Sequence, residues 1–159
     1  MPRIKLWLAV TALLASVVFG LSGTAAAANT EDQQLLALVN EQRAAADLPP
    51  LVENQQLGTA AQSYADYMAV NNFFAHKGLD GSTLVSRAEA AGYTSWSFLG
   101  ENLAAGQPTP ERVVTAWMKS PTHRANILSS EAHEIGFGLA RNASSKYRVY
   151  WAMEIGTAW

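Results

Sequence analysis

The sequence predicts an α+β domain in which helices pack on a small antiparallel sheet. In several segments between residues 31 and 128, apolar residues recur at three- and four-residue steps, which is typical of amphipathic helices. The pattern then changes to alternation over 134–140 and 147–155, which is typical of strands. Residues 142–145 between these runs favour a turn. The two runs therefore predict an antiparallel hairpin.

Five helices are predicted, covering residues 31–46, 54–71, 82–92, 109–117 and 120–128. Asn54 is a favourable N-cap for the second helix, and Thr109 followed by Pro110 is a favourable start for the fourth. Gly92 is suited to the position just after the third helix, where a left-handed backbone is common. Residues 93–104 are rich in aromatic side chains and favour an extended segment.

The composition limits the classes of protein and of site. A chain of 159 residues supports one ordinary domain, and 49% hydrophobic residues argue against wholesale disorder. A pI of about 5.9 argues against nucleic-acid binding, which needs clustered Lys and Arg. With no cysteine, the chain can form neither a disulfide nor a thiolate metal site, and it has no cysteine nucleophile.

The N-terminus has the pattern of a secretory signal peptide. Two basic residues lie within the first five positions, an apolar run covers 6–21, and small residues fill 22–28. The alternative is a membrane anchor, but the run is shorter than the ~20 residues needed to span a bilayer. We expect residues 1–28 to be a cleaved signal peptide, leaving a secreted or cell-envelope domain over 29–159 with no stable membrane insertion.

Three side chains carry the candidate chemistry. His76 lies in a loop rich in Gly and Asp, which presents its imidazole from irregular backbone. His123 lies in the first turn of a predicted helix, where the helix dipole favours the neutral ring that binds metals. Glu101 lies inside an apolar run, and burying a carboxylate there is costly unless it is paired or coordinated.

Other polar residues receive structural interpretations. Ser120 could act as a nucleophile beside His123, but its position before Pro121 is explained more simply as a helix cap. His133 is expected to be solvated. Glu154 alternates with apolar neighbours, and we expect it to lie on an outward face of the sheet.

An ordered set of motifs adds a resemblance to a known family. The motifs are Phe74-Ala75-His76 with Asp80-Gly81, then Gly100-Glu101-Asn102-Leu103-Ala104, residues 117–128 around His123, Glu134-Ile135-Gly136-Phe137-Gly138, and Tyr150-Trp151. This set resembles the superfamily of cysteine-rich secretory proteins, antigen 5 and pathogenesis-related proteins, called the CAP or SCP domain, and most closely its bacterial secreted branch. The resemblance covers about Leu35 to Trp159. It implies a three-layer α-β-α sandwich with a central antiparallel sheet between helices.

The resemblance also implies a surface cleft with two histidines and two acids. The family's first histidine corresponds to His76, its Gly-Glu-Asn acid to Glu101 and its second histidine to His123. The second acid would fall at Ser120, so that carboxylate is missing, and Asp80 is the candidate replacement. His76, His123, Glu101 and Asp80 are thus the expected ligands of a divalent cation such as zinc, while His76, Glu101 and His123 are the expected catalytic residues of an enzyme.

Three functions stay open at this point. The first is a secreted domain, expected to be monomeric, whose cleft binds a metal ion or a small ligand. That ligand class includes lipids and peptides, because family members bind sterols or fatty acids. The second is a peptidase-like hydrolase that uses the same cleft. The third is a non-catalytic extracellular interaction module in which these residues stabilise the fold. The family does not decide between them, because catalysis is not a general property of its members.

Overall fold

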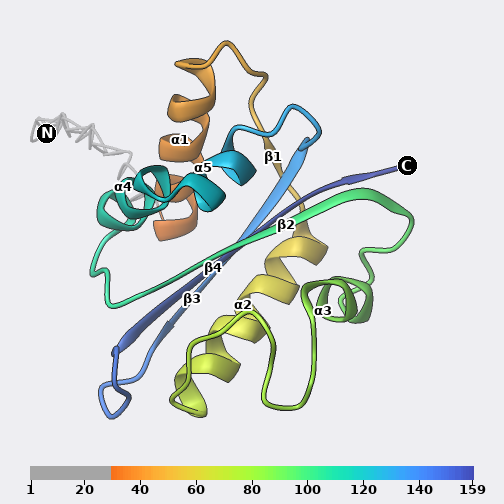
Figure 1. Ribbon diagram of the computed structural model, residues 1–159. Coiled ribbons are helices and arrows are strands. Elements are labelled where there is room, and N and C mark those ends of the chain that lie inside the picture. Colours follow the sequence, from red (N-terminus) through yellow and green to blue (C-terminus); the bar gives the residue numbers. More distant parts are fainter. Residues whose placement is uncertain (1–29) are drawn as a thin grey trace, which may run out of the picture.

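A four-stranded sheet crosses the domain with helices on both faces (Figure 1). The computed structural model describes residues 30–159, so the signal-peptide prediction lies outside the described residues. In chain order the elements are α1 (Glu31–Ala44), β1 (Val52–Glu53), α2 (Gln55–Val70), α3 (Leu84–Ala90), β2 (Trp96–Ala105), α4 (Pro110–Lys119), α5 (Pro121–Ile127), β3 (Glu134–Arg141) and β4 (Val149–Ala158). The predicted α+β class and the three-layer α-β-α sandwich are confirmed. Within 30–159, no helix is long and apolar enough to cross a membrane.

The helices begin where the capping residues predict. The Asn54 side chain accepts hydrogen bonds from the backbone of Gln56 and Leu57 at the start of α2, and the Thr109 side chain caps α4 in the same manner. Gly92 follows α3 with a φ of +91°, as expected for its role. Ser120 occupies the N-cap position of α5, but its side chain makes no capping bond. The cap position was thus predicted correctly and the capping interaction was not.

The strands follow the order β1-β3-β4-β2. The predicted hairpin is confirmed, because β3 and β4 pair antiparallel with Leu139 opposite Trp151. Strand β2 pairs antiparallel with the other edge of β4, so β4 is central. Strand β1 pairs parallel with β3 and was not predicted, because a strand of two residues has too little length to show alternation.

Each face of the sheet has its own apolar core. Helices α1, α4 and α5 cover one face, where Trp117 packs with Trp151 and Met153. Helix α2 covers the other face and packs against Tyr150 and Ala152. Strand β3 meets α2 almost backbone to backbone, because a Cβ on Gly136 would lie only 2.1 Å from the Gly58 nitrogen. This close approach sets α2 directly over β3 and β4.

A buried arginine joins α1 to the segment after α5. Arg43 is only 1% exposed. Its Nε donates to the carbonyl of Pro49 at 2.8 Å, and Nη1 donates to the carbonyls of Ile127 and Ser129, both at 2.8 Å. Its Nη2 donates to the Ala132 carbonyl at 3.3 Å. The guanidinium therefore satisfies four carbonyls that no regular element pairs.

Candidate functional site

The centre of the site is the Glu101 carboxylate on β2. One oxygen, Oε1, lies 2.6 Å from Nδ1 of His76, and the other, Oε2, lies 2.5 Å from Nη2 of Arg87. The Glu101 side chain is 3% exposed, whereas the His76 side chain is 63% exposed. Both oxygens of the buried carboxylate therefore have a hydrogen-bonding partner. A carboxylate in an apolar run needs such partners, because burying it unpaired is costly.

Helices α2 and α3 hold the loop that carries His76. The Arg87 guanidinium stacks on the ring of Tyr64, with its carbon 3.4 Å from the ring centroid, and also donates to the His76 carbonyl at 3.3 Å. The Tyr64 hydroxyl donates to the Ala75 carbonyl at 2.6 Å. These contacts fix the backbone on both sides of the His76 Cα, so the imidazole is positioned by side chains from two helices.

Two asparagines tie the helix that carries His123 to the backbone of β2. The Asn102 side chain donates to the His123 carbonyl at 2.9 Å. The Asn126 side chain donates to the Glu101 carbonyl at 3.1 Å and to the Asn102 side-chain oxygen at 2.8 Å. Helix α5 is therefore tied to β2 at Glu101, and the His123 ring centroid lies 6.5 Å from that of His76.

The two imidazoles differ in their affinity for a proton. The hydrogen bond to Glu101 raises the pKa of His76 above its usual value, and this effect outweighs burial. Burial lowers the pKa of His123, and the neighbouring charge of His76 lowers it further. Near neutral pH, His76 therefore holds a proton more readily than His123. Because Nδ1 of His76 faces Glu101, its Nε2 is the ring nitrogen left for a ligand.

The Glu101→Gln variant should lower the pKa of His76, because a neutral amide removes the favourable charge while burial and Arg87 still oppose protonation. The shift is measured by following the His76 ring carbon resonance against pH. Glu89→Gln is the matched control, since Glu89 lies on the same helix as Arg87 and is exposed. An equal His76 pKa in wild type and Glu101→Gln would contradict the assigned pairing.

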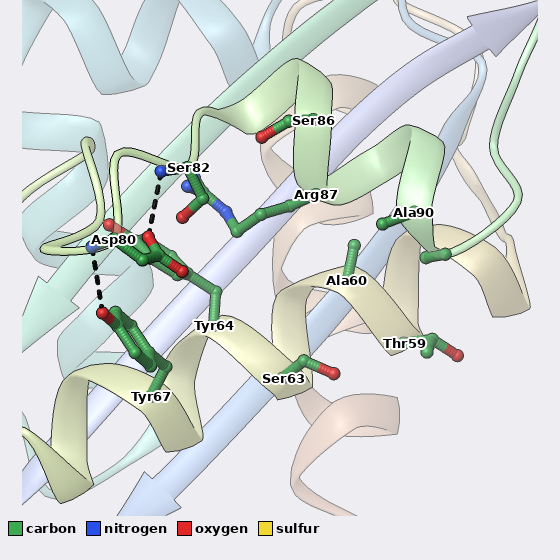
Figure 2. A pocket seen from close by; sticks show the side chains of 11 residues that line it. Thr59, Ala60, Ser63, Tyr64, Tyr67, Asp80, Ser82, Ser86, Arg87 and Ala90 are labelled. Atoms are coloured by element: carbon green, nitrogen blue, oxygen red, sulfur yellow. Dashed lines mark hydrogen bonds between the residues drawn. The ribbon is translucent and has the colours of Figure 1, made fainter.

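His76 and Glu101 line a cleft of about 360 Å³ together with Lys77, Thr83 and Leu84. Asp80 lines a neighbouring groove of about 390 Å³ between α2 and α3. Figure 2 shows this groove, with Arg87 reaching from α3 toward Tyr64 and Asp80. One oxygen of Asp80 accepts from the Ser82 backbone at 2.9 Å. The structure thus places His76 and Glu101 in one cleft, with the His123 ring centroid 6.5 Å from that of His76, and it places Asp80 in the groove beyond Arg87.

Sequence reasoning missed the residues that position the site. Arg87 is the only basic residue between Lys77 and Arg112, and this isolation was the available signal. Asn102 and Asn126 both lie within the family motifs, but nothing in those motifs indicated that their side chains position His123. Nothing in the spacing singled out Tyr64.

The expectation for Glu154 is wrong. This side chain is fully buried, and neither of its carboxylate oxygens has a hydrogen-bond partner among the described residues. On β4 it lies between Glu101 of β2 and Gly136 of β3, on the face that α2 covers. Burial raises the pKa of Glu154 to about 8, and the negative charge of Glu101 adds to the effect. Alternation correctly placed Glu154 on the face of β4 opposite to Met153 and Ile155, but it did not show that α2 covers this face.

The described residues do not fit the expected zinc site. Residues 30–159 contain no group of three or more His, Asp or Glu side chains placed to hold a metal ion. A zinc site takes at least three protein ligands. Both Glu101 oxygens already accept from other side chains, and the Arg87 charge lies directly beside them. Only the two imidazoles remain for coordination.

Comparisons with known proteins agree with this architecture. The model of the Cysteine-rich secretory protein family, CAP, matches residues 36–155, so the chain belongs to the CAP family, although it has no cysteine. YkwD of Bacillus subtilis (strain 168) is 34% identical over 113 residues, which make up 71% of this chain and 44% of that protein. The chain therefore spans less than half the length of this relative.

Two solved structures are similar over most of the chain. An outer surface protein from Borrelia burgdorferi has a TM-score of 0.71 at 25% identity, and the match covers 79% of this chain and 90% of that protein. An extracellular protein containing an SCP domain from Bacillus anthracis str. Ames has a TM-score of 0.69 at 26% identity, and the match covers 80% of this chain and 40% of that protein. The predicted family and its bacterial branch are thus supported by both sequence and fold.

Proposed function

We propose that this CAP-domain protein acts outside the cell and binds a small ligand in the cleft lined by His76 and Glu101, next to the His123 ring. An extracellular location is supported by the signal-peptide pattern over residues 1–28. It is also supported by the similar proteins from Bacillus anthracis and Borrelia burgdorferi, described as an extracellular protein and an outer surface protein.

One observation carries the ligand-binding proposal. Glu101 has both oxygens engaged inside the protein, and the ring it holds remains largely exposed. A histidine held in place only to support the fold gains nothing from presenting Nε2 to solvent. A fixed, accessible imidazole beside a second imidazole is instead suited to bind a polar group of a ligand.

A screen of the full protein against peptides, lipids and small polar compounds tests this proposal. A true ligand should shift the NMR signals of His76 and His123 while leaving those of His133, which is exposed outside the cleft, unchanged. His76→Asn should weaken binding by about tenfold or more, corresponding to about 1.4 kcal/mol, and His133→Asn should not. Ligands that bind His76→Asn as tightly as wild type would contradict the proposal.

The hydrolase alternative has one specific observation in its favour. A carboxylate bonded to Nδ1 of an imidazole whose other nitrogen faces solvent is the arrangement that orients a general base. In this reading His76 would take a proton from water, and Glu101 would hold the ring in the required tautomer. Glu101→Gln should then abolish most turnover of any substrate found while the protein stays folded. Unchanged turnover would remove this pair from the mechanism.

A further inference from the structure

The cleft beside His76 offers cationic and hydrogen-bond-donating groups to solvent. Of the described residues that line it, Glu101 is the only acid, and its side chain is 3% exposed. Lys77 and His76 line the same cleft and are both exposed. A ligand that enters from solvent therefore meets an ammonium group and an imidazole before it meets any carboxylate.

The charge of Glu101 is already neutralised within the protein. Arg87 contacts Oε2 at 2.5 Å, and its side chain is only 9% exposed, so this ion pair is poorly screened by solvent. The charges of Arg87 and Glu101 cancel, which leaves the net charge of the cleft to Lys77 and to any proton on His76. This net positive charge would repel an arriving cation and attract an arriving anion.

The spacing of the two imidazoles suits one oxygen-bearing group. A hydrogen bond from a ring nitrogen to oxygen measures about 2.7–3.2 Å. Rings whose centroids lie 6.5 Å apart, tilted by 45°, leave room for such a group to contact both. The backbones that carry the rings are held by Tyr64 on one side and by Asn102 on the other. The two donors are thus placed before the ligand arrives.

We propose that the cleft lined by His76 and Lys77, with the His123 ring nearby, binds a small oxyanion, namely the carboxylate or phosphate group of its ligand. This inference rests on the proposed function, because it names the ligand class of the same cleft. Nε2 of His76 donates to one oxygen, the nearby His123 ring donates to the same group, and Lys77 contributes long-range attraction. Arg87 acts as a positioning residue that cancels the charge of Glu101 without touching the ligand.

NMR titration of the full protein tests the inference at about pH 6, where histidine is readily protonated. The probes are inorganic phosphate, acetate and zinc chloride, each added separately. We expect phosphate or acetate to shift the His76 and His123 signals saturably and to leave His133 unmoved. His76→Asn should weaken the apparent affinity about tenfold, and His133→Asn should leave it unchanged. The wild-type shifts test the inference even if a variant fails to fold.

Vesicles containing phosphatidylglycerol distinguish the source of the anion. Vesicle binding that inorganic phosphate competes away would assign the group to a lipid headgroup, and phosphate binding without vesicle binding would assign it to a soluble ligand.

Zinc shifts at both histidines, with none from phosphate or acetate, would overturn the anion inference while leaving a ligand-binding cleft. No shift at either histidine from these probes or from the ligand screen would overturn both proposals. Equal phosphate shifts at His133 would show non-specific binding and overturn the inference alone.

Discussion

Replacing Glu154 with glutamine should make folding stability much less dependent on pH. In the unfolded chain this acid loses its proton near its ordinary pKa of 4.5, whereas in the folded protein it keeps the proton to about pH 8. The contribution to stability is therefore complete below pH 4.5 and is lost as the pH rises to about 8. At 1.36 kcal/mol per pKa unit, the loss reaches about 3 kcal/mol at pH 7.

Chemical denaturation at several pH values measures this effect. Relative to its difference from wild type at pH 4.5, Glu154→Gln should gain about 3 kcal/mol in free energy of unfolding at pH 7 and about 4 kcal/mol at pH 8. Other titrating groups are common to both proteins and cancel in the comparison. The exposed Glu89→Gln variant should follow the wild-type profile. A constant difference between Glu154→Gln and wild type across this range would show that Glu154 is ionised in the folded protein.

Replacing Arg43 with methionine should destabilise the domain severely. Methionine fills much of the same space but leaves without a donor the carbonyls of Pro49, Ile127, Ser129 and Ala132. Unsatisfied buried acceptors cost about 1–3 kcal/mol each when they cannot reach water. Because some of these carbonyls are only partly buried, we expect a total loss of about 3–5 kcal/mol in the free energy of unfolding.

Arg43→Lys separates the role of charge from that of geometry. A lysine ammonium keeps the charge but cannot contact carbonyls spread around a planar guanidinium, so it should recover only a small part of the loss. Arg112→Met on the exposed face of α4 is the control and should change stability by less than about 0.5 kcal/mol. Thermal and urea unfolding report all three variants. A loss below about 1 kcal/mol in Arg43→Met would mean that water satisfies these carbonyls.

Local sequence signals predicted most of the fold. Asn54 and Thr109 marked helix starts through side chains that cap the backbone, and such interactions are encoded within a few residues. The hairpin was predicted from alternation on both sides of a turn. The burial of Arg43 was not predicted, because its four carbonyl partners lie as far along the chain as residue 132. Nothing in the local sequence distinguishes a buried arginine from an exposed one.

The sequence predicted the main residues of the candidate site but not the contacts that join them. Residue chemistry identified His76, Glu101 and His123, but only the ordered family motifs suggested that they meet. Arg87 was missed because its role depends on Tyr64 from another helix and on a carboxylate fourteen positions away. Glu154 was placed on the correct strand, yet its burial depends on how closely α2 packs against β3, which follows from Gly136 and Gly58 in three dimensions.

The order in which the cleft histidines titrate tests the central claim most directly, namely that Glu101 is shared between His76 and Arg87. NMR of the wild-type protein resolves His76 and His123 separately across the neutral range. If the carboxylate holds His76, its pKa must lie above that of His123, which burial and the neighbouring charge hold down. An equal pKa, or a higher one for His123, would show that the two oxygens of Glu101 are not arranged as described.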